Sequence, residues 1–470
     1  MSGGVRAEPC RTGGVSGAGD NGIMTHAIPV SLPSALVEHH AVDLERKYTA
    51  GWGMKVDDVA TAPSGEINVL HRVHRSTYGV PRDEADPAKA DFGYTLLTRH
   101  APDGTVLATA VSGQAEYLRQ DTTLGGPTTG LGTDLWRAEG LCVLPDGTLA
   151  ATAPGDGTHL IAADLTAVTV HHGSVRRGDH GPHDPFATWI STTPAGRMLC
   201  TTGEYGVHGY GSRIDNIVSL ADRPLTPASK PTLRALASMD AQPVKQTRAD
   251  LRPDVLFGGT PVGMDHRPRP SLTEHLTKTE YAAREGDWYD ARLGRPAVVR
   301  EDLFVVPVYG HIYRSGSRGQ RFAFVLVDDR GENVGRLGGM DLYRDSPFTG
   351  FCFEIAADPV RERIYHLNRY GLFAWKATGV RAQRLDLDQS RYRLLKHFTL
   401  MDCTPEGELI LAHRTQHLLL RIPCPADLGD LGRVVEEALR SYAKERTALK
   451  RRWQPVNWHW VDSTAALHRL

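Results

Sequence analysis

The chain has 470 residues, of which 40% are hydrophobic and 23% are charged, and its formal net charge is −1. This composition excludes a disordered chain, and the near-neutral charge argues against a global field that draws the protein to nucleic acid or anionic membranes. The 48 glycines and 29 prolines suit many tight turns and fit a helical bundle poorly.

The first segment, residues 1–50, is expected to be a disordered or extended tail. Its start is rich in glycine and lacks the apolar region of a secretory signal, and Met24 is an alternative start to Met1. No apolar stretch of the chain approaches the roughly 18 residues that a membrane-spanning helix needs. We therefore expect a cytoplasmic protein without a membrane partner.

Self-similar segments recur over residues 51–425 and predict one all-β domain, a β-propeller. Each begins with an apolar strand, a turn and a second strand, and glycine supplies the left-handed residue of the turn. The turns are Pro63-Ser64-Gly65, Pro145-Asp146-Gly147, Pro194-Ala195-Gly196 and Pro405-Glu406-Gly407. Third and fourth strands follow most of these hairpins, and such meanders repeated radially form a propeller.

The spacing predicts six blades, with seven as the alternative. The blades are expected at residues 54–113, 135–172, 186–222, 297–339, 350–385 and 396–422. The interval 223–296 is predicted to be an insertion, or a degenerate seventh blade together with an insertion. A second insertion, 73–93, splits the first blade between its second and third strands, and loops of such length are often functional.

The C-terminal segment, residues 426–470, leaves the repeat pattern. Apolar residues at helical spacing, with acidic residues early and basic residues late, predict one amphipathic helix over 427–452. Three tryptophans follow: Trp453, Trp458 and Trp460. They are expected to pack either on the propeller itself or on the surface of a protein partner.

The repeat pattern resembles the NHL repeat and the related gluconolactonase-type and strictosidine-synthase-like propellers. The resemblance implies a propeller more than any one activity, because these repeats serve enzymes, sensors and scaffolds alike. His71, Asn368 and His413 stand where an NHL repeat usually carries aspartate. This departure argues against functions that depend on those acids.

A metal site in the central channel is one interpretation of the polar loops. His180, His183 and Asp184 lead into a predicted inner strand, and two imidazoles with a carboxylate suit a transition metal. Glu139 resembles the Glu-Gly of gluconolactonase-like propellers, which hold a divalent cation in the channel. These four residues would hold one zinc or calcium ion; the alternative is a solvated histidine-rich loop.

Acidic residues recur where the predicted inner strands begin. They either surround the channel or cap turns and pair with the abundant arginines. The set is Asp57, Asp58, Glu139, Asp184, Glu354 and Asp402. The six cysteines form no CxxC pair, so we expect buried, reduced thiols and no cysteine-based zinc site.

Two functions of different classes follow. The first is a non-catalytic scaffold that docks a protein partner through the loop insertions and the C-terminal tail. The alternative is a metal-dependent hydrolase or lyase that acts in the channel, where a small ligand fits under either hypothesis. The basic helix end favours nucleic acid only weakly against a neutral total charge, and GxSxG, P-loop and HExxH motifs are absent from the sequence.

Overall fold

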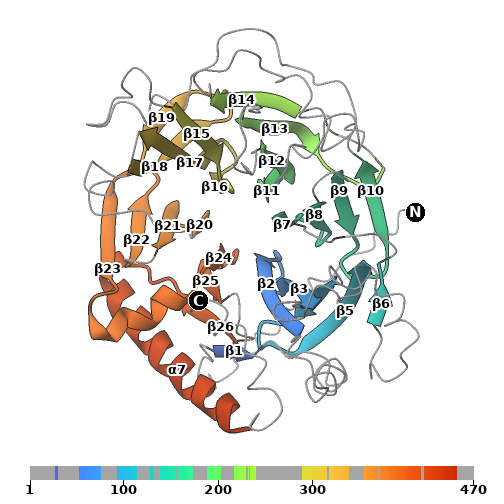
Figure 1. Cartoon of the computed structure of the whole chain (residues 1–470), viewed down its shortest axis with the longest axis vertical. Helices are drawn as coiled ribbons and strands as arrows, with labels where there is room; N and C mark the ends of the chain where they lie inside the picture. Colours follow the sequence, from blue (N-terminus) through green and yellow to red (C-terminus); the bar gives the residue numbers. More distant parts are fainter. Residues whose placement is uncertain are drawn as a thin grey trace, which may run out of the picture.

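The described strands form six sheets around a central axis, antiparallel except for the β5–β6 pair (Figure 1). This arrangement confirms the predicted six-bladed propeller with a C-terminal helix. The computed structural model describes residues 27–29, 52–75, 93–113, 128–131, 135, 138, 140–153, 157–172, 188–202, 216–228, 231, 233–239, 288–314, 317–337, 354–368, 371–413 and 418–452.

The first two blades are four-stranded meanders whose first strand lies nearest the axis. The first blade consists of β2 (Trp52–Thr61), β3 (Ile67–Arg75), β4 (Gly93–His100) and β5 (Val106–Gly113), with β6 (Thr128–Gly130) parallel to β5. The second blade consists of β7 (Gly140–Val143), β8 (Leu149–Ala153), β9 (Gly157–Ile161) and β10 (Val168–His172).

The next two blades take strands from the interval 223–296. The third consists of β11 (Thr188–Thr192), β12 (Arg197–Thr202), β13 (Asn216–Pro224) and β14 (Leu233–Met239). The fourth consists of β15 (Trp288–Leu293), β16 (Ala297–Arg300), β17 (Leu303–Arg314), β18 (Ser317–Asp328) and β19 (Asn333–Arg336). The interval predicted as an insertion thus contains β14 and β15, and the part between these strands, 240–287, lies outside the described residues.

The last two blades bring the two ends of the chain together. The fifth consists of β20 (Glu354–Asp358), β21 (Arg363–Asn368), β22 (Gly371–Lys376) and β23 (Arg381–Asp386), and helix η3 (Ser390–His397) follows. The sixth consists of β24 (Leu400–Cys403), β25 (Glu408–Ala412), β26 (Leu418–Pro423) and β1 (Ala27–Pro29). Because β1 pairs with β26, three residues of the expected N-terminal tail close the ring.

The two faces of the ring carry different kinds of connection. Connections between first and second strands, and between third and fourth strands, lie on one side, which we call the turn face. Connections between second and third strands, and between blades, lie on the opposite side, the insertion face. Most long segments between described strands leave from and return to the insertion face, among them 76–92, 173–187, 203–215, 240–287 and 338–353. Segment 114–127 instead joins the insertion-face end of β5 to the turn-face start of β6, because these two strands are parallel.

The predicted Pro-x-Gly turns are present, and they lie on the turn face. Gly65, Gly147, Gly196 and Gly407 all have positive φ, between +81° and +86°. Gly407 has a second reason to be glycine, because a Cβ there would come within 1.8 Å of the Arg361 guanidinium.

Apolar clusters fill the spaces between neighbouring blades. Val56 and Ile67 of the first blade, for example, pack with Ile410 and Leu419 of the sixth. Corresponding clusters lie between each of the other neighbouring pairs. Each sheet therefore buries both faces against its neighbours, which requires the ring to close.

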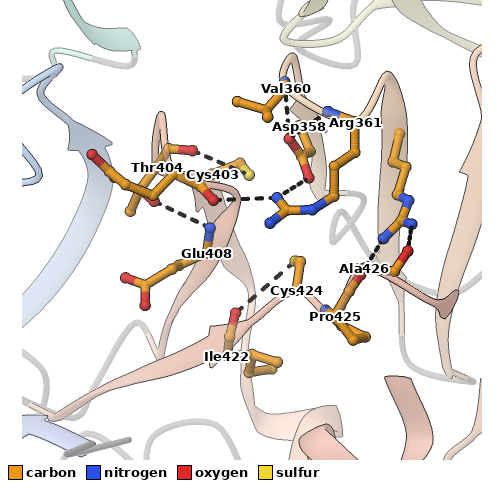
Figure 2. A network of polar contacts seen from close by, with 12 residues as sticks. Asp358, Val360, Arg361, Cys403, Thr404, Glu408, Ile422, Cys424, Pro425 and Ala426 are labelled. Atoms are coloured by element: carbon orange, nitrogen blue, oxygen red, sulfur yellow. Dashed lines mark hydrogen bonds and ion pairs between the residues drawn. The ribbon is translucent and has the colours of Figure 1, made fainter. Parts of the chain in front are cut away.

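Polar contacts also join the blades at the turn face. Figure 2 shows the junction of the fifth and sixth blades, where buried Asp358 accepts from the backbone N–H groups of Val360 and Arg361 at 3.0 and 3.1 Å. The Arg361 guanidinium donates to Asp358 at 2.9 Å and to the carbonyl of Glu406 at 3.2 Å. Arginines make similar links elsewhere to the next blade's turn: Arg99 to Ala163, Arg234 to Asp329 and Arg421 to Pro102.

The predicted C-terminal helix is present as η4 (Leu428–Asp430) followed by α7 (Leu431–Arg452). Its apolar residues Leu431, Val435 and Tyr442 are buried in one cluster with Leu420 of β26. The helix is therefore part of the propeller's packing, on the outside of the last blades (Figure 1). Within the described parts of the chain, no helix is long and apolar enough to cross a membrane.

Removing β1 tests the closure of the ring. A variant lacking residues 1–23 keeps β1, whereas one lacking residues 1–31 leaves the edge of β26 unpaired. We expect the shorter truncation to keep the wild-type free energy of unfolding and the longer one to lose about 2–4 kcal/mol, since several backbone hydrogen bonds disappear. Urea titration followed by circular dichroism measures the difference; equal midpoints for the two truncations would contradict it.

Candidate functional site

The candidate site lies at the axis, where a break in the inner position of the fourth blade places an arginine. Residues 294–296 separate β15 from β16, and both strands pair with β17. The third blade holds this break, because the hydroxyl of Thr201 donates to the carbonyl of Gly294 at 2.8 Å and that of Ser191 to Pro296 at 2.5 Å. The middle residue of the break is Arg295.

Arg295 joins the fourth blade to the first and second. Its Nη1 lies 2.6 Å from Oδ1 of Asp58 on β2, and its Nη2 donates to the carbonyl of Leu141 on β7 at 2.7 Å. The side chains of Arg295 and Asp58 are only 13% and 3% exposed. This is therefore a buried, charge-assisted pair, and breaking one is far more costly than breaking a surface pair.

Backbone N–H groups donate the other hydrogen bonds to the Asp58 carboxylate. Oδ1 also accepts from the N–H of Val59 at 2.9 Å, and Oδ2 accepts from the N–H of Leu141 at 2.8 Å. The register of β2 against β3 shifts between Val56 and Asp58, which is a β-bulge at Asp57. Bulges re-aim side chains, and this one accompanies the burial of Asp58 while Asp57 stays half-buried.

A second inner-strand carboxylate, Asp402 of β24, ties the sixth blade to the first. Its Oδ2 accepts from the N–H of Thr61 at 2.7 Å and lies 2.9 Å from the Thr61 hydroxyl. That hydroxyl also lies 3.0 Å from the carbonyl of Cys403. Asp402 is thus engaged by the end of β2, and its charge acts on Arg295.

Burial and the Arg295 guanidinium have opposite effects on the pKa values of Asp58 and Asp402. Burial raises the pKa of Asp58 to about 6, although Arg295 and two backbone N–H groups oppose it. Burial likewise raises the pKa of Asp402, again against Arg295. Burial alone would lower the pKa of Arg295, but Asp58, Asp402 and Glu354 together raise it. The positive charge of Arg295 therefore interacts with carboxylates of three other blades.

The structure brings together part of the predicted set of acids. Asp58, Asp402 and Glu354 all act electrostatically on Arg295. Glu139 and Asp184 lie outside the described residues. Arg295 itself was missed, because a single arginine in Leu293-Gly294-Arg295-Pro296 matches no motif. Its position before an inner strand, where other blades carry acids, is the signal that could have revealed it.

The predicted metal ligands and tryptophans remain predictions. Glu139, His180, His183 and Asp184 lie outside the described residues, as do Trp453, Trp458 and Trp460. Within the ranges that are described, no group of three or more His, Cys, Asp or Glu side chains is arranged to hold a metal.

His71, Asn368 and His413, at the positions where an NHL repeat usually carries aspartate, lie in different environments. The ring Nε2 of buried His71 lies 3.0 Å from the hydroxyl of Thr98. Asn368 accepts from the N–H of Gly371 at 3.1 Å, and its amide lies 3.1 Å from the ring of buried His366. The third, His413, is half-buried at the end of β25.

The described cysteines fit the expectation of reduced, inert thiols. Cys142, Cys200, Cys403 and Cys424 are all free, and burial raises the pKa of Cys142 to about 12. A thiol with so high a pKa is neither a nucleophile nor a ready metal ligand at neutral pH. Cys10 and Cys352 lie outside the described residues.

Comparison with known proteins gives similarity of fold only. No protein-family model matches the chain, and no curated protein sequence matches it. A gluconolactonase from Xanthomonas campestris is 10% identical, covering 84% of this chain and 97% of that one, with a TM-score of 0.37. The WD40 propeller domain of Doa1 is 10% identical, with coverages of 80% and 97% and a TM-score of 0.31.

A third similar structure is the β-propeller domain of Cps50 (Swd1) from Myceliophteria thermophila. It is 9% identical, with coverages of 78% and 96% and a TM-score of 0.33. At these identities and TM-scores the similarity carries no argument about activity or partners.

The raised pKa of Asp58 predicts an unusual pH dependence of stability. The native state holds the Asp58 proton more tightly than the unfolded chain does, so acidification through about pH 6 favours the native state. The free energy of unfolding of the wild type, relative to Asp58→Asn, should rise by about 1 kcal/mol between about pH 7.5 and about pH 5. Urea titrations measure this. The control is Asp388→Asn at an exposed position, which keeps Asp58 and should therefore show the same rise as the wild type.

The channel metal is tested by metal content. If Glu139, His180, His183 and Asp184 bind zinc or calcium, tag-free protein should retain about one ion per chain after dialysis. His183→Ala should lose the ion without unfolding, and His397→Ala, on another blade, should keep it. Plasma mass spectrometry gives the ratio, and a wild-type protein without stoichiometric metal would contradict the prediction.

Proposed function

We propose that the protein is a non-catalytic propeller scaffold that docks a protein partner on its insertion face. The observation that carries this proposal is the state of the axial carboxylates. Asp58 has both oxygens engaged by Arg295 and backbone N–H groups, and Asp402 accepts from Thr61. A channel cation would have to compete with the fixed guanidinium for these oxygens, so the described part of the axis suits a structural role.

The distribution of chain length supports the insertion face as the binding face. The turns that join first to second strands on the turn face are tight, as at 62–66 and 404–407, and leave little chain for recognition. The long segments 76–92, 173–187 and 240–287 join strand ends on the insertion face. Segments that a rigid scaffold holds by both ends are common carriers of binding residues.

Helix α7 restricts how the C-terminal segment can contribute. Its apolar residues, Val435 and Leu439 among them, are buried against the last blades, so that side is not available to a partner. The tryptophans that follow Arg452, namely Trp453, Trp458 and Trp460, are the part of the segment that we assign to the partner, because tryptophan is enriched at binding hot spots.

Variants of the full chain test the proposal after a partner has been isolated with it and identified by mass spectrometry. The first variant replaces residues 240–287 with a short Gly-Ser linker, and the second lacks residues 453–470, so both keep the blades and α7. Binding of the purified partner should weaken by at least about 10-fold in one or both, as expected when hot-spot residues are lost.

The matched control places charge on the turn face instead. Asp146→Arg changes an exposed residue at the tip of a tight turn and should leave the affinity within about 2-fold, since rim charges contribute little. A partner whose affinity falls in Asp146→Arg but not in the two insertion-face variants would overturn the proposal.

A further inference from the structure

Three elements bring basic side chains together beside the sixth blade. Lys396 and His397 end helix η3, His413 follows β25, and Arg446 lies late in α7. The ring centroids of His397 and His413 are 6.0 Å apart, with 38° between the ring planes. Helix η3 lies in the connection between the fifth and sixth blades, and β25 leads into the connection between a second and a third strand. Both ends therefore lie on the insertion face.

Packing contacts set these three elements against one another. The N–H of Thr399 donates to the carbonyl of Ala412 at 3.0 Å, which sets the exit of η3 against the end of β25. Phe398 packs edge-on against Tyr442 of α7, with ring centroids 5.0 Å apart. Arg446 lies four residues after Tyr442, on the same side of the helix.

Ion pairs are described for other arginines of α7 but not for Arg446. Arg433 and Arg440 form ion pairs with Glu437 and Glu436. Among the described contacts, Arg446 has no ion pair, and its Nε is buried without a hydrogen-bond acceptor. Its neighbour Glu445 lies about 100° away around the helix, because an α-helix has 3.6 residues per turn.

The cluster is electrostatically unfavourable as it stands. Burial together with the positive charges of Lys396 and Arg446 lowers the pKa of His397. Lys396 and His397 are exposed, and His413 and Arg446 are half-buried, so solvent reaches the cluster. Like charges held together by packing repel one another, and an anion bound among them would remove that repulsion.

We propose that Lys396, His397, His413 and Arg446 form a binding site for a phosphate-type oxyanion. A guanidinium presents planar paired donors, an ammonium adds a point charge, and imidazoles donate when protonated; phosphate oxygens accept from all three. The phosphate is either that of a free phosphate ester or that of a phosphorylated side chain on a partner. Only the second source rests on the proposed scaffold function.

Direct titration tests the site on the full chain. Inorganic phosphate and a short phosphoserine peptide are titrated in low-salt buffer, with calorimetry for affinity and histidine ring NMR for His397. Binding should raise the pKa of His397, because anion and proton binding are reciprocal. Arg446→Gln and Lys396→Gln should each weaken binding at least about 5-fold, whereas Arg433→Gln, a matched loss of charge on the same helix, should stay within about 2-fold.

The two probes distinguish the sources of phosphate. A phosphopeptide that binds at least about 10-fold more tightly than inorganic phosphate, while its unphosphorylated form does not bind, indicates a phosphorylated partner. Equal affinities indicate a free phosphate ester. Exposed Lys396→Gln keeps the test valid if Arg446→Gln is unstable.

The inference is overturned if neither probe saturates the protein, or if Arg433→Gln weakens binding as much as Arg446→Gln and Lys396→Gln do. Such a result leaves the scaffold proposal intact, because the variants lacking 240–287 or 453–470 test partner binding separately. Conversely, phosphate binding that survives the loss of those segments supports the site even if no partner docks.

Discussion

Closure of the ring is the constraint on which the rest of this structure depends. Each blade is a sheet that must bury both faces, and only its two neighbours can cover them. At the junction of the first and last blades, β1 completes the sixth sheet, and the apolar cluster around Ile67 and Ile410 fills the space between the blades. Arg421, which reaches from the sixth blade to the Pro102 carbonyl of the first, adds a polar contact at the same junction.

Closure also creates the axis, where inner strands of different blades come close enough for their charges to interact. Asp58, Glu354 and Asp402 would repel one another there without a counter-charge. Arg295 supplies it from a break between two short strands, and the backbone of Leu141 completes its contacts. Among the described residues, Arg295 thus supplies a counter-charge to the axial carboxylates from within the ring.

On the outside of the last blades, the packing that stabilises the ring also holds basic side chains near the surface. Helix α7 covers the last blades with its apolar side, and the contact of Tyr442 with Phe398 carries Arg446 toward the end of η3. The packing of α7 and the proposed oxyanion site therefore depend on the same contact. A substitution at Tyr442 would disturb both, whereas one at exposed Lys396 would change charge alone.

Interactions between residues close together in the chain determine many features of this fold, and the sequence shows them. The Pro-x-Gly turns with their left-handed glycines, the alternation of short apolar strands and the amphipathic pattern of α7 depend on neighbours within a few residues, so they could be predicted. Several inner-strand acids were also found, because they recur at the same point of each repeat.

Tertiary structure decided the rest, because it depends on contacts between residues far apart in the chain. Ala27 pairs with Leu420, and no local pattern marks three residues as the strand that closes a ring. Arg295 acquires its role only when inner strands of other blades surround it. His397, His413 and Arg446 lie in separate elements, and packing of η3, β25 and α7 brings them together. Ring closure and side-chain packing act at long range, so the sequence alone could not specify these sites.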